Sequence, residues 1–208
     1  TPKAKSEANP ILISRTPYDV YPNSEDNFIK DLFLYSFNRY FMEDYIMVFQ
    51  DVRGKHMSEG DFEDIRPVIP VKNSNKDIDE TTDTWDTVDW LIKNVKNNNG
   101  NVGITGISYP GFYSTMGLIN AHPAVKAVSP QAPVTAWFIG DDFHHNGAFF
   151  LQDCFSFFYS NGRPRKAPSK TRNPGFRYPA SDSYEFFLSL GSVKDITDTY
   201  FGDSIEFW

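Results

Sequence analysis

Short apolar runs alternate with amphipathic segments over the first two thirds of the chain. Four of these runs have the length of buried strands, at residues 10–14, 45–50, 102–107 and 125–130. Three segments between them are predicted helices, at residues 27–42, 84–95 and 110–121. In the first two, apolar side chains recur at helical spacing along one face. Strands that alternate with helices favour a parallel, doubly wound sheet whose sites lie at the carboxyl ends of the strands.

The pattern changes after the fourth predicted strand, where the strand rhythm is lost. An aromatic-rich stretch at 149–159 is followed by a basic, proline-rich loop at 163–177 and an amphipathic segment at 184–190. Aromatic residues make up 16% of the chain, and they concentrate in this part. We therefore predict that residues 1–133 form the N-terminal part of the sheet core and that residues 134–208 form a mostly helical region that caps it.

The densest chemical signal is the segment from Gly103 to Gly111, in which Gly106 and Gly111 bracket Ser108. An apolar strand, a glycine-flanked serine and a following helix are the parts of a nucleophile elbow, where the serine lies on a sharp turn. The hydroxyl then stands at a helix N-terminus, whose N–H groups favour developing negative charge. The second glycine falls one place late, and Pro110 takes its position, which the first turn of a helix tolerates. The alternative is a glycine-bounded turn without a catalytic role.

The overall charge and composition limit the kinds of partner that the chain can have. A net charge of −7 argues against nucleic acid, because neutralising phosphates needs a basic face. No apolar run approaches the ~20 residues of a membrane helix, so no membrane partner is expected. Cys154 is the only cysteine, which excludes an internal disulfide. Asp51 and Arg53 are predicted to form an ion pair that holds their loop, and the alternative is that they contact a substrate.

The four histidines do not complete a serine-hydrolase triad in the expected order. In α/β-hydrolases the acid and the histidine follow the serine along the chain. His56 precedes the serine, and His122 lies at the far end of the helix predicted after it. His144 and His145 are adjacent, so at most one is expected to point inward, and both are better interpreted as satisfied polar groups of the cap. We therefore expect that the catalytic acid, the histidine and the closing strands lie beyond Trp208.

Four motifs taken together resemble the X-prolyl dipeptidyl-peptidase family of serine hydrolases. They are Arg15-Thr-Pro-Tyr18, Gln50-Asp-Val-Arg-Gly54 with Ser58-Glu-Gly60, Asp83-Thr-Trp-Asp-Thr-Val-Asp-Trp90 and Gly103-Ile-Thr-Gly-Ile-Ser-Tyr-Pro-Gly111. Within the family, the resemblance is strongest to α-amino acid ester hydrolases and to proteins labelled glutaryl-7-aminocephalosporanic acid acylase. The family's elbow is Gly-x-Ser-Tyr-x-Gly, which accounts for the late second glycine. The resemblance implies an α/β-hydrolase fold, incomplete in this chain, with a helical cap insertion.

The resemblance also implies roles for four residues of the chain. Ser108 is the expected nucleophile, and the backbone N–H of Tyr109 and the hydroxyl of Tyr18 are the expected oxyanion donors. A phenol suits this task because it donates a hydrogen bond without carrying charge. In the segment 140–147, Asp142 is the aspartate expected to receive the α-ammonium group of a substrate. The alternatives are an ordinary turn tyrosine at position 18 and a helix-capping aspartate at position 142.

The expected activity is that of a serine hydrolase that cleaves esters or amides of α-amino acids or β-lactam side chains through an acyl-enzyme. The alternatives are an X-prolyl dipeptidyl peptidase or another esterase of the family, and a binding module without activity. The resemblance places the catalytic acid and histidine, and a jelly-roll domain, in a C-terminal part that this chain lacks, so the chain alone is expected to be inactive. It also suggests a secreted or periplasmic enzyme, able to form homo-oligomers, that takes a small ester, amide or peptide and needs no cofactor or metal.

Overall fold

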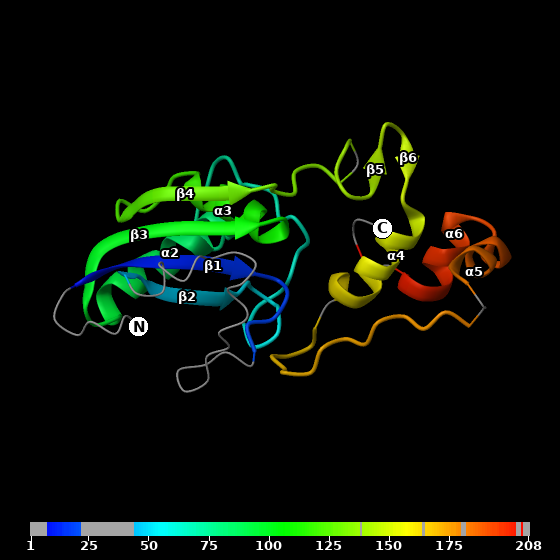
Figure 1. Cartoon of the computed structure of the whole chain (residues 1–208), viewed down its shortest axis with the longest axis horizontal. Helices are drawn as coiled ribbons and strands as arrows, with labels where there is room; N and C mark the ends of the chain where they lie inside the picture. Colours follow the sequence, from blue (N-terminus) through cyan, green and yellow to red (C-terminus); the bar gives the residue numbers. More distant parts are fainter. Residues whose placement is uncertain are drawn as a thin grey trace. The chain divides into compact units, whose positions relative to one another are not determined.

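The computed structural model describes residues 8–21, 44–137, 139–163, 165–179, 182–202 and 205. The chain divides into two compact units (Figure 1). Residues 1–53 and 65–134 make up the first unit, and residues 54–64 and 135–208 make up the second. The helix predicted at residues 27–42 lies outside the described residues.

A parallel sheet forms the centre of the first unit. Its described strands are β1 (Asn9–Thr16), β2 (Ile46–Asp51), β3 (Asn98–Ile107) and β4 (Val125–Gln131). They lie in the order β2-β1-β3-β4, and every neighbouring pair is parallel. The four predicted strands and the parallel α/β fold class are therefore confirmed. Because parallel strands point the same way, their carboxyl ends share one edge of the sheet, at the arrowheads in Figure 1.

Among the described residues of this unit, two helices accompany the sheet, α2 (Glu80–Asn94) and α3 (Tyr109–Leu118). The start of α2 is fixed by Asp79, whose carboxylate accepts the N–H groups of Thr81 and Thr82 at 3.0 Å each and pairs with Lys72 at 2.8 Å. Burial opposes ionisation of this carboxyl, but these contacts outweigh it and hold the pKa of Asp79 well below its usual range. The helix consequently begins four residues before the predicted start at residue 84.

The sheet and α2 share one hydrophobic core. Its buried members come from all four strands or their approaches and from one face of the helix: Ile11, Ile13, Ile46, Val88, Leu91, Val102, Ile104 and Ala124. Burying a side chain of this size contributes about 1.5–3 kcal/mol relative to leaving it in water. This core is what holds β1 and β3 side by side, and with them the two turns at their carboxyl ends.

The second unit has its own core, built almost entirely from aromatic side chains. Its elements are β5 (His144–His145), β6 (Ala148–Phe149), α4 (Leu151–Phe157), the π-helical turn η2 (Phe158–Gly162), α5 (Ser183–Leu190), α6 (Val193–Ile196) and the π-helical turn η3 (Thr197–Phe201). Phe155 is fully buried at the centre, and seven aromatic rings of the described residues surround it, those of Tyr159, Phe176, Tyr178, Phe186, Phe187, Tyr200 and Phe201.

A stretch without helix or strand separates the helices of the second unit, at the position of the predicted proline-rich loop. The described residues between 163 and 179 form neither helix nor strand, and this stretch contains four prolines. Proline removes a backbone donor and obstructs the preceding turn of a helix, so such a segment cannot continue α4.

Among the described residues, no helix is both long and apolar enough to span a membrane.

Residues 54–64 belong to the second unit because their side chains bond within it. The buried ammonium group of Lys55 donates to the carbonyl of Asn161, and the indole N–H of Trp137 donates to Asp64 at 2.7 Å. Burial lowers the pKa of Lys55 to about 8, against the opposing influence of Asp64. The sequence did not separate this short segment from the sheet core, because its partners lie about 100 residues away.

Candidate active site

The turn between β3 and α3 holds Ser108 in a conformation that L-residues rarely adopt. Its φ is 64° and its ψ is −124°, and such a state persists only where the surrounding structure imposes it. The Ser108 N–H donates to the carbonyl of Gln131 at 3.0 Å, and the Ser108 carbonyl accepts from Phe112 at 3.1 Å and from Val134 at 3.3 Å. The side chain of Ser108 does not cap α3. The backbone is therefore fixed on both sides while the helix makes no use of the hydroxyl.

Two glycines make this turn possible, because α3 passes very close to β3 and β4. A Cβ atom at Gly106 would lie 2.2 Å from the Pro110 carbonyl oxygen, and one at Gly111 would lie 2.7 Å from the Gln131 carbonyl oxygen. Both distances are far inside van der Waals contact, and both obstacles are backbone atoms. Helix α3 begins at Tyr109, so Pro110 is its second residue rather than its first. Neither position needs the missing N–H for an intrahelical bond.

Tyr109, which follows the serine, is buried and held through its ring. The ring stacks on that of Tyr113 with a centroid distance of 5.1 Å and an interplanar angle of 21°. Its hydroxyl accepts the N–H of Ile65 at 2.8 Å. The backbone N–H of Tyr109 belongs to the first turn of α3, where N–H groups have no intrahelical partner and point out of the helix N-terminus. The ring contacts therefore fix the direction of a backbone donor beside Ser108.

Tyr18 lies in the turn after β1, the strand that pairs with β3. Its N–H donates to Thr16 Oγ1 at 3.0 Å. Its ring meets the ring of Tyr109 edge-on, with centroids 6.2 Å apart and an angle of 82° between the planes. The residue is 40% exposed, so a ligand can reach it. The structure thus brings Tyr18, Ser108 and Tyr109 together at the carboxyl edge of the sheet.

Asp142, the fourth predicted site residue, belongs to the second unit. It lies in a turn, and the nearest helix, α4, begins at Leu151 with Phe150 as its N-cap, so the helix-capping alternative is wrong. The neighbouring Asp141 accepts the N–H of Thr135 at 2.6 Å and that of Asp142 at 2.9 Å. Within the described part of the chain, the carboxylate of Asp142 itself accepts no hydrogen bond. Partial burial and the negative charge of Asp141 raise the pKa of Asp142.

Two of the histidines make contacts that fit a structural role. His144 Nδ1 lies 3.1 Å from the carbonyl oxygen of Trp137, and its ring stacks on Phe149 at 4.9 Å. His122 Nδ1 accepts the N–H of Ala124 at 3.1 Å. Among the residues that the structure describes, no cluster of three or more His, Cys, Asp or Glu side chains could hold a metal ion.

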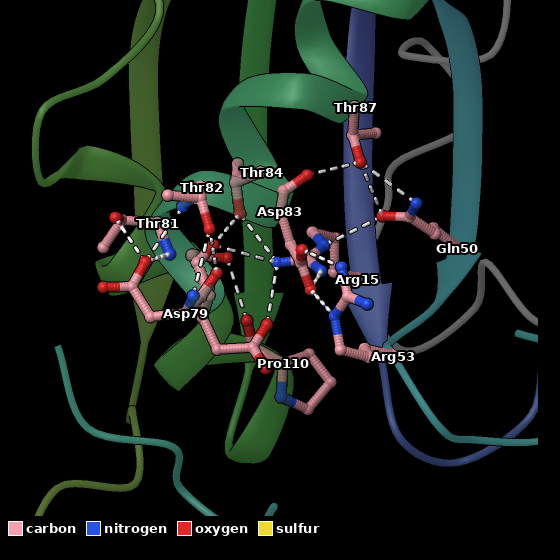
Figure 2. A network of polar contacts seen from close by, with 12 residues as sticks. Arg15, Gln50, Arg53, Asp79, Thr81, Thr82, Asp83, Thr84, Thr87 and Pro110 are labelled. Carbon is pink, nitrogen blue, oxygen red and sulfur yellow. Dashed lines mark hydrogen bonds and ion pairs between the residues drawn. The ribbon is translucent and has the colours of Figure 1, made fainter. Parts of the chain in front are cut away.

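A buried arginine near this edge was missed by the sequence analysis, which ended the first strand at residue 14. In the structure β1 continues to Thr16, and Arg15 is only 2% exposed. Its guanidinium donates to Glu80 Oε2 at 3.0 Å, to Thr84 Oγ1 at 2.7 Å and to Gln50 Oε1 at 2.8 Å (Figure 2). Burial raises the pKa of Glu80 despite the opposing charge of Arg15. The period-two row Ile11, Ile13, Arg15 was the available signal that this side chain faces the core.

The prediction that Arg53 pairs with Asp51 is also wrong. Arg53 forms a two-pronged contact with Asp83 of α2, with Nε at 2.8 Å and Nη2 at 2.5 Å, as Figure 2 shows. Asp51 instead accepts the N–H of Val20 at 3.0 Å. Asp83 also lies 4.0 Å from the guanidinium of Arg15. Both arginines therefore converge on the first turn of α2, where acidic side chains are favoured by the helix dipole.

A groove of about 410 Å³ lies elsewhere in the first unit, between β2 and α2. Its lining is mainly apolar, from Val48, Phe49, Trp90 and Leu91, with a few polar groups. None of the four predicted site residues lines it. The groove is therefore separate from the candidate site at Ser108.

Comparisons with known proteins show which family and which solved structures this chain is similar to. A sequence model of the X-Pro dipeptidyl-peptidase (S15) family matches residues 1–185. A solved α-amino acid ester hydrolase labelled with selenomethionine is 38% identical over 94% of this chain, with a TM-score of 0.75. A solved aminopeptidase from the marine sediment archaeon Thaumarchaeota archaeon is 31% identical over 97% of the chain, with a TM-score of 0.78. The chain spans 31% and 33% of the lengths of these two structures. No curated protein matches it.

We expect Gly106→Ala to lower the free energy of unfolding by more than about 2 kcal/mol, because the new methyl group must displace backbone atoms in a close-packed turn. Urea unfolding followed by circular dichroism measures the change. Gly175→Ala is the matched control, since a Cβ atom there has nothing within 4 Å, and its effect should stay within about 0.5 kcal/mol. Equal stability of the two variants would contradict the close passage of α3 over β3.

Proposed function

The chain belongs to the X-Pro dipeptidyl-peptidase (S15) family, and we propose that it carries the nucleophile and the oxyanion donors of a serine hydrolase. The proposed reaction is cleavage of esters or amides of α-amino acids, or of β-lactam side chains, through an acyl-enzyme. The observation that carries the proposal is the positive φ of Ser108 at the N-terminus of α3. A strained serine on a strand-to-helix turn is the geometry of a nucleophile elbow.

The proposed chemistry begins with Ser108. Its Oγ forms a bond to the substrate carbonyl carbon, its proton passes to a general base, and the carbonyl electron pair moves onto oxygen. Collapse of the tetrahedral intermediate breaks the bond to the alcohol or amine, which leaves with that proton, and an acyl-enzyme remains. Water then repeats the sequence and releases the acid. The general base and its acidic partner are proposed to come from the rest of the complete protein.

The oxyanion is proposed to be bound by two donors that directly follow the neighbouring strands β1 and β3. The N–H of Tyr109 lies in the first turn of α3, so the helix dipole adds to its effect. The hydroxyl of Tyr18 is carried by the turn after β1, next to the Tyr109 ring. Support comes from preorganisation: both tyrosines are held by contacts present before any substrate binds, and fixed donors stabilise a developing charge most effectively.

Asp142 is proposed to bind the α-ammonium group of the substrate. Two observations favour it over Asp141. The carboxylate of Asp141 is committed to the N–H of Thr135, and that of Asp142 accepts no hydrogen bond within the described residues. The neighbouring negative charge makes a bound cation at Asp142 more favourable, since it would relieve the repulsion between the two carboxylates.

A second candidate function is that of an X-Pro dipeptidyl peptidase. The description of the matching family and the likeness to an aminopeptidase both favour it. It would use the same serine and the same oxyanion donors, and it too would bind a substrate with a free amino group. The leaving group separates the two candidates, because an esterase releases an alcohol or a β-lactam amine and the peptidase releases the amine that follows proline.

We expect Ser108→Ala in the complete protein to leave the fold intact and to abolish covalent labelling by a fluorophosphonate probe, because the attacking oxygen is gone. Mass spectrometry of the labelled peptide measures this. Ser114→Ala is the matched control, since that serine lies in the same helix and donates its hydroxyl to the Pro110 carbonyl. Labelling that survives in Ser108→Ala, or an unlabelled wild-type protein, would remove Ser108 from the mechanism and favour a binding module.

We expect Tyr18→Phe to lower kcat by about 10²–10³ with a small change in KM, because one oxyanion donor is lost and substrate binding is not. Steady-state kinetics on an amino acid ester provide both constants. Tyr21→Phe removes a hydroxyl three residues further along the same turn and should leave kcat unchanged. If Tyr18→Phe and Tyr21→Phe behave alike, Tyr18 is an ordinary turn residue.

We expect Asp142→Asn to lower kcat/KM strongly for α-amino esters and little for matched esters that lack the amino group, because only the former carry the cation. The comparison measures kcat/KM for both substrates with the wild-type protein and with Asp142→Asn. Asp141→Asn is the comparison variant: it removes the neighbouring charge but leaves the Asp142 carboxylate, so the loss on α-amino esters should be smaller than in Asp142→Asn. An equal loss on both substrates in Asp142→Asn would contradict the ammonium-binding role.

A further inference from the structure

Arg15 occupies a position where the strand pattern calls for an apolar side chain. Along β1, Ile11 and Ile13 are fully buried, and Arg15 continues the same face with 2% of its surface exposed. Arginine is almost never buried to this extent unless it is paired. Replacing a buried ion pair by apolar residues is often neutral or stabilising, so stability alone does not explain an arginine here.

The guanidinium group of Arg15 is held in a single orientation by partners from two elements. Gln50 at the end of β2 accepts from its Nε at 2.8 Å. Glu80 and Thr84 of α2 accept from its Nη1 at 3.0 Å and 2.7 Å, and Asp83 lies 4.0 Å from its Nη2. Because the planar fork offers its donors in fixed directions, this set of partners fixes the plane of the group as well as its position.

The Arg15 guanidinium also touches the aromatic stack behind the serine. Its Cζ atom lies 5.7 Å from the centroid of the Tyr113 ring, within reach of a cation–π contact. The Tyr113 ring in turn stacks on the Tyr109 ring at 5.1 Å. An unbroken series of packed groups therefore leads from α2 through Arg15 and Tyr113 to Tyr109, whose N–H is one proposed oxyanion donor.

The backbone of Arg15 leads directly to the other proposed donor. Arg15 is paired in register with Gln50 of β2, and Tyr18 follows three residues later, with its N–H bonded to Thr16 Oγ1 at 3.0 Å. A side chain that fixes the end of β1 also fixes the start of this turn. One buried cation is thus connected to both donors, to one through the side-chain stack and to the other through the chain.

We infer that Arg15 is a positioning residue for the oxyanion site: it fixes the Tyr109 ring through Tyr113 and the Tyr18 turn through the end of β1. This inference rests on the proposed function, since it assigns a role relative to the two proposed donors. Arg15 thus joins the site residues proposed above, but unlike them it touches no substrate. A residue that served the fold alone would affect stability without a selective effect on kcat.

The test uses Arg15→Lys in the complete protein, because lysine keeps the positive charge beside Glu80 but lacks the planar fork. We expect kcat to fall by about 10²-fold, the effect of a misplacement near 1 Å, with KM changed much less. Asp79→Asn is the matched control, since Asp79 is equally buried at the start of α2 and none of its three partners named above touches the tyrosine stack. It should lower the melting temperature at unchanged kcat. Equal kcat losses in the two variants would overturn the inference.

A double-mutant cycle with Tyr18→Phe gives a sharper result. If Arg15 acts by placing the oxyanion donors, the loss caused by Arg15→Lys should shrink when the Tyr18 hydroxyl is already absent, because residues that act as a unit are not additive. Fully additive losses would contradict the role at Tyr18.

Hydrogen exchange of the peptide covering residues 106–113 decides the packing part of the inference without reference to activity. Exchange there should be faster in Arg15→Lys and unchanged in Asp79→Asn. Unchanged exchange in Arg15→Lys overturns the inference whether or not the protein is active. Failure of the proposed function has a different signature, a wild-type protein that no fluorophosphonate labels at Ser108.

Discussion

The carboxyl edge of this sheet depends on how closely α3 passes over the strands beneath it. Backbone atoms occupy the space into which a side chain at Gly106 or Gly111 would project. That closeness forces the chain to turn within one residue, so Ser108 takes up a strained φ that its hydrogen bonds to β4 and α3 maintain. The strain is local, but the sheet sustains it, because the Gln131 carbonyl that binds the serine N–H is itself held in the β3–β4 pairing.

The same edge gathers groups from strands that are distant in sequence. Tyr18 follows β1 and Tyr109 follows β3, and the parallel pairing of β1 with β3 brings their rings into contact. Beneath them, Arg15 and Arg53 meet Glu80 and Asp83 at the first turn of α2. These charges are paired with one another, and the apolar core of Ile11, Ile13 and their neighbours begins immediately beside them. The network therefore joins the core to the edge where the chemistry is proposed.

The sequence predicted those features that short-range pattern determines. The strand runs and the α/β class were confirmed, because a run of apolar residues acts on its immediate surroundings. The partners of Arg15 and Arg53 were not predicted, since their acceptors lie 30 to 69 residues further along the chain. A charge pattern within one loop suggested the Asp51–Arg53 pair, and tertiary packing replaced it.

The proposed catalytic and substrate-binding roles are divided between the two units. The serine and both oxyanion donors lie in the unit whose core is aliphatic, and Asp142 lies in the unit whose core is aromatic. The two cores are separate clusters: the rings around Phe155 pack against one another, as do the isoleucines and valines under the sheet. Under the proposed function, substitutions that reshape the aromatic unit would change recognition of the substrate at Asp142, while the strained turn at Ser108 keeps its supports. The proposed chemistry, which depends on a fixed geometry, would then be separated from a recognition that can vary, as expected where function is carried by sites placed on a common fold.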